Sequence, residues 1–212
     1  MTTWIENPEG GRDRGPAGFA RAWLEALVRP RRFFRNGIAP GDQAPGLAFG
    51  VFVALCYVVG LLAFSPEPVV GTETIPLVAG SEAATATLLL LAVALFVAPA
   101  TLHLTAALQT LLLIAIVPDR GGVSQTVQTI AYATAPCVFA GLPVPLLRVT
   151  CAAYGALLLV VGVAVVHRAS PVRAVLAAAV PAALVFGYGF GGFAAAEAVL
   201  AGDGLGVVAG VV

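Results

Sequence analysis

Five long stretches of the chain contain no Asp, Glu, Lys or Arg, and apolar residues fill most of each one. A helix needs about 20 apolar residues to cross the ~30 Å hydrocarbon core of a bilayer. Helices are the expected form because lipid cannot satisfy open backbone groups. The pattern therefore predicts an all-α, polytopic integral membrane protein with a five-helix transmembrane bundle. The five stretches are residues 43–66, 83–118, 121–147, 149–167 and 174–196.

The second stretch, residues 83–118, admits two interpretations. It is either one long helix kinked at Pro99 or a hairpin of two short spans. Basic residues favour the cytoplasmic side of a membrane. With five spans and a cytoplasmic N-terminus, Arg148 is the only base outside, whereas six spans would leave three Arg outside. We therefore expect five spans in the cell membrane, with the N-terminus cytoplasmic and the C-terminus extracytoplasmic.

Before the first span, the spacing of apolar and charged residues predicts an amphipathic helix over residues 17–29, followed by a kink at Pro30. Aromatic residues among bases are typical of a helix that lies in the membrane interface, where each Arg near anionic lipid headgroups contributes about 1 kcal/mol. Docking of a protein partner is the alternative. The residues expected to make these contacts are Trp23, Arg29, Arg31, Arg32, Phe33 and Phe34.

Composition narrows the class of protein. Of the 212 residues, 59% are hydrophobic and 10% are charged, against about 25% charged in soluble domains. The chain therefore has too few charges for a soluble enzyme, a disordered protein or a nucleic-acid binder. Motifs of known enzyme classes are absent, and Cys56, Cys137 and Cys151 lie in apolar stretches without metal-site spacing. We expect no enzymatic activity, no cofactor and no metal.

A few polar residues fall inside the predicted spans. The third span carries one polar face, which either lines a path for a solute or forms hydrogen bonds between helices. The spans contain no acidic residue, which argues against coupled transport. His103 is either a proton-responsive or ligand-binding group or a neutral donor to a carbonyl of a neighbouring helix. The residues of this candidate polar path are His103, Gln125, Gln128, Thr129 and Tyr132.

Three local motifs, taken in order, carry a resemblance to a known family. They are Pro30-Arg31-Arg32-Phe33-Phe34 before the first span, Tyr132-Ala133-Thr134-Ala135-Pro136 in the third, and the turn from Gly162 to Ala174 that includes His167, Ser170 and Arg173. With these motifs the chain resembles the Yip family of Ypt/Rab-interacting membrane proteins, in particular its prokaryotic branch. The resemblance implies five membrane helices and a cytosolic N-terminus. Eukaryotic members act in vesicle traffic and bind small GTPases through the N-terminal side. This chain has no Asp-Leu-Tyr-Gly-Pro motif, so that binding is not expected here.

The sequence thus divides into four expected parts. Residues 1–16 are a disordered N-terminus, 17–44 a cytoplasmic amphipathic segment, 45–196 a Yip-like five-span domain, and 197–212 an extracytoplasmic tail. The expected function is that of a non-enzymatic adaptor or organiser of membrane processes acting through its N-terminal segment. A passive channel or small-solute transporter using the polar face is the alternative. The partners that the sequence admits are the lipid bilayer, anionic headgroups, another protein and a second copy of the chain.

Overall fold

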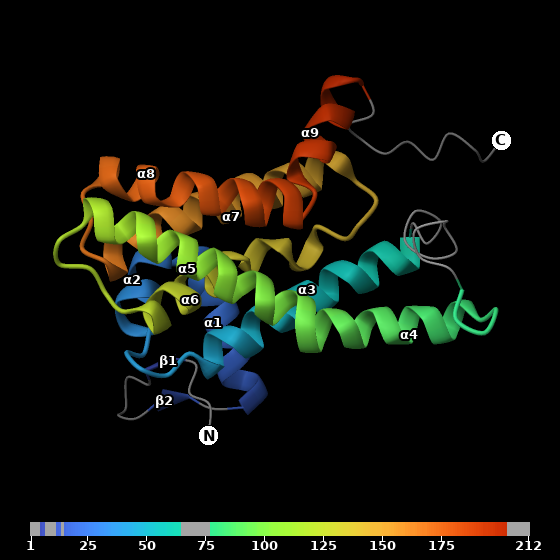
Figure 1. Cartoon of the computed structure of the whole chain (residues 1–212), viewed down its shortest axis with the longest axis horizontal. Coiled ribbons are helices and arrows are strands. Elements are labelled where there is room, and N and C mark those ends of the chain that lie inside the picture. The colour runs from blue at the N-terminus through green and yellow to red at the C-terminus, as the bar shows by residue number, and fades with distance from the viewer. Residues whose placement is uncertain (1–4, 7–11, 14, 65–76, 203–212) are drawn as a thin grey trace.

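The computed structural model of the chain describes residues 5–6, 12–13, 15–64 and 77–202. These residues form a bundle of helices (Figure 1). The elements are β1 (Ile5–Glu6), β2 (Arg12–Asp13), α1 (Gly15–Val28), α2 (Pro30–Asn36), α3 (Ala44–Phe64), α4 (Glu82–Ala92), the π-helix η1 (Val93–Val97), α5 (Ala98–Ile116), α6 (Val123–Ala133), the 3₁₀-helix η2 (Ala135–Phe139), α7 (Pro145–Val166), α8 (Pro171–Ala182), the π-helix η3 (Ala183–Gly189) and α9 (Gly192–Leu200).

Four helices among the described residues are long and apolar enough to cross a membrane. Their outer faces keep large hydrophobic side chains exposed, for example Leu104 and Leu111 on α5 and Leu176 on α8. Such faces are expected to meet lipid, because they have no protein neighbours. The fold class of a helical integral membrane protein is therefore confirmed. The four helices span Ala44–Phe64, Glu82–Ile116, Pro145–Val166 and Pro171–Gly189.

The ambiguous second stretch is one continuous helix, formed by α4, η1 and α5. Its 35 residues give a length of about 52 Å at 1.5 Å per residue. The expected irregularity lies just before Pro99, where the Ala98 amide donates to the Val93 carbonyl five residues back. A π-turn at this point accommodates Pro99, which has no amide proton to donate to the helix. The interpretation as a hairpin of two short spans is therefore wrong.

The third expected span, residues 121–147, is shorter than the sequence predicts. It is realised as the 11-residue helix α6 followed by the 3₁₀-helix η2, and α6 alone extends only about 16 Å. The regular helix ends at Thr134, whose hydroxyl donates to the Ala131 carbonyl, and Pro136 follows with no backbone donor. This segment is not one of the four long apolar helices. It lies inside the bundle, where α3, α5 and α7 contact it.

The last expected span ends earlier than residue 196. The helix that begins at Pro171 finishes at Gly189, and α9 then leaves in a new direction, as Figure 1 shows. Gly191 makes this reversal, because its φ of 68° lies in the left-handed region that glycine adopts without penalty. The expected tail therefore begins inside α9, and residues 203–212 lie outside the described part of the chain.

The N-terminal elements gather on one side of the bundle, away from α9 (Figure 1). Helix α1 contacts α6 and η2, and α2 packs against α7. Within residues 1–16, which we expected to be disordered, Ile5–Glu6 pairs antiparallel with Arg12–Asp13, and α1 begins at Gly15. The rest of that stretch, and residues 65–76 of the expected outer loop, lie outside the described residues.

Candidate functional site

Helix α1 uses its aromatic face to bind the bundle. The Phe19 ring lies 5.1 Å from that of Phe49 and 4.8 Å from that of Phe52, both on α3. The indole Nε1 of Trp23 donates a 2.9 Å hydrogen bond to the Ala135 carbonyl. At the end of α1 the Tyr154 hydroxyl donates to the Leu27 carbonyl. The face that we expected to enter the membrane interface therefore contacts protein.

Phe33 and Phe34 are core residues of the bundle. Their side chains are 0% and 1% exposed, and the Phe33 ring lies 4.8 Å from that of Tyr132. Phe34 packs against Gly162, where an added Cβ would come within 3.0 Å of its ring. The expectation that these two rings meet headgroups or a partner is wrong, because both point into the bundle. Phe33 packs against Tyr132, and Phe34 packs against Gly162 of α7.

The arginines of the N-terminal segment have the opposite placement. The four arginines between residues 29 and 35 are exposed. Arg32 Nε lies 4.0 Å from Glu25 Oε2, at the outer limit of an ion pair, and the two side chains are 52% and 18% exposed. The segment thus presents guanidinium groups outward while its aromatic residues hold it in place. The four exposed arginines are Arg29, Arg31, Arg32 and Arg35.

The polar face of α6 is used for hydrogen bonds within the protein. Gln128 is fully buried and binds both backbone groups of Ala39, its Nε2 donating to the carbonyl at 2.7 Å and its Oε1 accepting from the amide at 3.1 Å. The Thr129 hydroxyl donates to the Gln125 carbonyl at 2.7 Å. Gln125 Oε1 accepts from the Gly122 amide at 2.9 Å. These bonds fix the connection between α2 and α3 and the start of α6.

His103 lies apart from this buried face. It is exposed on α5, and its Nδ1 lies 2.7 Å from the Pro99 carbonyl. Tyr132 is buried between the rings of Phe33 and Phe49, at 4.8 and 4.9 Å. The five residues of the candidate polar path are therefore distributed between the outer surface of α5 and the packed centre of the bundle.

A basic pocket opens where α7 ends and α8 begins. Its volume is about 630 Å³, within the range of pockets that hold small molecules. Three guanidinium groups line it. Apolar side chains of α2, α7 and the residues just after α2, together with Gln125 of α6, form the rest. None of its described lining residues is acidic. We call these residues the basic pocket: Arg31, Phe34, Arg35, Ile38, Gln125, Ala164, Val165, Val166 and Arg168.

Arg168 reaches this pocket from a strained turn. Its φ of 53° lies in the left-handed region, which costs a residue with a Cβ about 1 kcal/mol. The preceding residue, His167, is fully buried, and its Nδ1 accepts a 3.1 Å hydrogen bond from the Gly121 amide. Burial, followed by the charge of Arg120, lowers the pKa of His167 to about 4. The imidazole is therefore neutral at pH 7 and joins the turn to the loop before α6.

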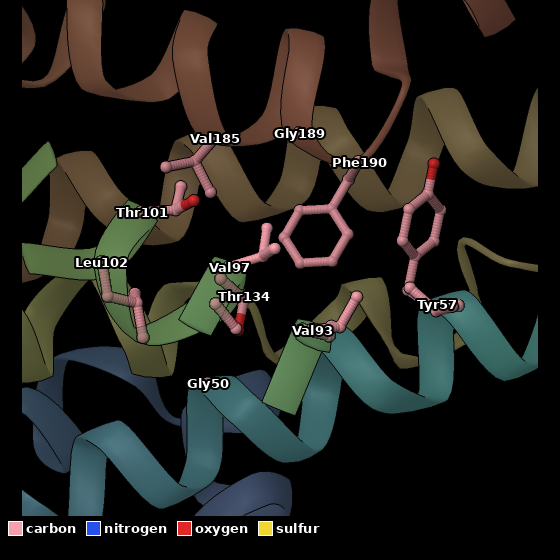
Figure 2. Close-up of a pocket in the computed structure, with 13 residues that line it drawn as sticks. Gly50, Tyr57, Val93, Val97, Thr101, Leu102, Thr134, Val185, Gly189 and Phe190 are labelled. Atoms are coloured by element: carbon pink, nitrogen blue, oxygen red, sulfur yellow. The ribbon is translucent and has the colours of Figure 1, made fainter. Parts of the chain in front are cut away.

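A second pocket, shown in Figure 2, lies among the apolar helices. Its volume is about 170 Å³, and both π-helical segments of the described chain contribute to its wall. The Tyr57 and Phe190 rings stand side by side at one end, with centroids 5.2 Å apart. The Thr134 hydroxyl, one of the few polar groups in its wall, donates to the Ala131 carbonyl. Apolar walls with few polar groups offer this pocket no evident acid–base or nucleophilic chemistry.

Sequence reasoning missed the basic pocket. Arg31 and Arg168 are far apart in the chain, and no pattern in the sequence distinguishes Arg35 from the other bases near it. The one available signal was the His167-Arg168 turn between two apolar stretches. Among the described residues, no group of three or more His, Cys, Asp or Glu side chains is placed to hold a metal ion.

Comparison with known proteins gives one assignment. The model of the Yip1 domain family matches residues 24–193, from α1 into α9. No curated protein and no solved structure matches the chain. The matched region includes the docked aromatic residues of α2, the centre of the bundle formed by α6, and the strained turn at Arg168. Because this match covers far more than half of the chain, the protein belongs to the Yip1 domain family of integral membrane proteins.

Proposed function

We propose that this Yip1-family protein is a non-enzymatic membrane adaptor that acts through its N-terminal segment. The observation that carries the proposal is the different placement of the aromatic and the basic side chains in that segment. Its aromatic side chains are bound to the bundle, whereas Arg29, Arg31, Arg32 and Arg35 are exposed. A rigidly held row of charges is suited to recognising a partner, because little side-chain and loop entropy is lost on binding.

The basic character of the segment also supports an orientation. Basic residues next to a first span favour the cytoplasmic side, so the N-terminal segment faces the cytoplasm in this proposal. The protein then sits in the cell membrane, as a fixed platform for a cytoplasmic or membrane-bound partner. The alternative of a channel has less support, since Gln128 and Thr129 are buried and hydrogen-bonded within the protein.

The test is chemical crosslinking in native membranes, followed by purification and mass spectrometry. The variant is Arg29→Gln/Arg32→Gln, which removes two exposed charges and leaves the buried aromatic contacts intact. Arg173→Gln, an exposed base on α8, is the matched control. We expect one recurrent partner with the wild type and the control, and its loss with the double variant. The same partners with all three proteins, or self-crosslinks only, would contradict the proposal.

A further inference from the structure

The basic pocket combines arginines of α2 with an arginine that the adaptor role does not use. Arg31 and Arg35 come from α2, and Arg168 comes from the turn after α7. Within the described part of the chain, none of these three guanidinium groups has a carboxylate within 4.0 Å, unlike Arg32, which faces Glu25. Three unneutralised charges around one pocket repel one another, and an anion placed between them would relieve that repulsion.

The chemistry of the lining residues indicates which anion fits. Arginine presents planar, paired donors that match the oxygens of a phosphate group. The Gln125 side chain also lines the pocket. Its Oε1 accepts from the Gly122 amide, and this bond fixes the amide group at the pocket wall. A phosphate is therefore a better match than a neutral or cationic group.

The apolar part of the pocket indicates that the phosphate belongs to a lipid. Phe34, Ile38 and the last turn of α7, Ala164 to Val166, form one wall. Helix α7 is one of the four helices able to cross a membrane, and it ends at Val166. The pocket thus joins the end of an apolar helix to a ring of positive charge. A soluble anion would contact only the guanidinium groups, whereas a lipid would contact the guanidinium groups with its phosphate and the apolar wall with its acyl chains.

The backbone at Arg168 gives a second, independent indication. Its left-handed conformation is one that a chain normally assigns to glycine or asparagine. Strain of this kind is found where a side chain has a role beyond the local fold. Here the strained residue is the one that places a guanidinium in the pocket opposite α2.

From these observations we propose that the basic pocket, with Arg31, Arg35 and Arg168, binds the phosphate headgroup of an anionic membrane lipid. The inference goes beyond the proposed adaptor role. It concerns different residues from the partner test, because Arg29 and Arg32 lie outside the pocket. Bound lipid would hold α2 against the turn between α7 and α8.

The test uses the full-length protein in a neutral detergent, with native mass spectrometry to count bound lipids. The probes are phosphatidylglycerol, whose phosphate is an uncompensated negative charge, and the zwitterionic phosphatidylcholine, whose phosphate is balanced by its own choline cation. We expect the wild type to bind phosphatidylglycerol more tightly, and Arg168→Gly to weaken that binding about tenfold, as loss of one charged hydrogen-bonding partner predicts. Arg29→Gln/Arg32→Gln is the control that removes more charge outside the pocket, and it should stay within about twofold of the wild type.

Thermal unfolding separates loss of the site from loss of the fold. Arg168→Gly relieves a left-handed backbone and should leave Tm unchanged or raised. Arg35→Gln, an exposed residue, is a second variant that should weaken lipid binding without a change in Tm. If the wild type fails to prefer phosphatidylglycerol, or if the control loses as much binding as Arg168→Gly, the proposal is wrong.

A competition experiment tests the source of the phosphate. Excess inorganic phosphate should displace phosphatidylglycerol only in part, because it cannot use the apolar wall. Full displacement would identify a site for soluble anions and overturn the lipid assignment. These outcomes differ from failure of the adaptor proposal, which concerns crosslinked proteins and the Arg29→Gln/Arg32→Gln variant. Either proposal can therefore fail while the other stands.

Discussion

Replacing Gln128 with methionine tests whether the polar face of α6 is structural. Methionine keeps the unbranched shape of glutamine, so Gln128→Met removes both hydrogen bonds to Ala39 with little change in packing. Ala39, only 6% exposed, then loses the partner of its amide, and its carbonyl keeps only a 3.4 Å bond from the Asp42 amide. A buried backbone group without a partner costs about 1–3 kcal/mol. Because the α2–α3 connection can shift toward solvent and recover part of this cost, we expect Gln128→Met to lower the free energy of unfolding by about 2–4 kcal/mol.

The matched control is Thr129→Val, which is equally buried on the same helix. The Thr129 hydroxyl donates to a carbonyl of its own helix, and that carbonyl keeps its backbone partner after the change. The expected cost is therefore under about 1 kcal/mol. A solute path along this face would make both substitutions alter flux, whereas a structural role makes only Gln128→Met lower stability strongly.

Thermal unfolding of the purified protein, followed by tryptophan fluorescence, measures the difference. At about 2–4 °C per kcal/mol for a chain of this size, Gln128→Met should lower Tm by about 5–15 °C. Limited proteolysis should also cut the α2–α3 connection of the variant faster. If Gln128→Met and Thr129→Val lower Tm equally, or if neither does while flux through vesicles changes, the structural interpretation of this face is refuted.

Three further results are expected from the same unfolding assay. The pKa of His167 is about 4 in the folded protein against about 6.5 in the unfolded chain. Because the unfolded chain takes up the proton first, the free energy of unfolding falls as the pH drops from 6.5 toward 4, by up to about 3 kcal/mol. A His167→Gln variant that keeps the full pH dependence would contradict this. Gly60→Ala should destabilise, because its Cβ would lie 2.8 Å from the backbone carbon of Gly141, whereas Gly189→Ala meets nothing closer than 3.4 Å and should be tolerated; equal Tm values would show that α3 and the turn after η2 separate freely. Phe34→Ala should cost about 3–5 kcal/mol, as a core substitution does, and Arg32→Ala less than about 1 kcal/mol; the reverse order would place Phe34 at a surface.

The long helices could be predicted from the sequence because each is an uninterrupted apolar stretch. The same criterion failed for residues 121–147, since an absence of charge does not reveal where a helix ends. Pro136 and the buried polar face of α6 shorten that segment, and the large share of buried residues in α6 identifies it as an interior helix. The irregularity near Pro99 was predicted, but the π-turn that accommodates it was not.

The amphipathic pattern of the N-terminal segment could not say what its apolar face contacts. Lipid and the outer surface of a helix bundle are both apolar, so the same pattern suits either. What decides the matter is the partner surface, namely Gly162 beside Phe34 and the Ala135 carbonyl beside Trp23. The basic pocket was beyond prediction for a related reason. Arg35 and Arg168 meet only because α2 packs along α7, and no local pattern records that contact.

Several polar side chains of this protein share one use, which bears on how it works. Gln128, Trp23 and Tyr154 each bind backbone groups of a segment distant in the chain, and His167 does the same. These bonds tie the N-terminal helices and the connecting loops to the bundle. A transport path needs polar groups that are free to exchange partners with a solute. Groups already paired with backbone favour a fixed arrangement, in which the bundle holds α2 in place and the arginines of α2 act at the surface.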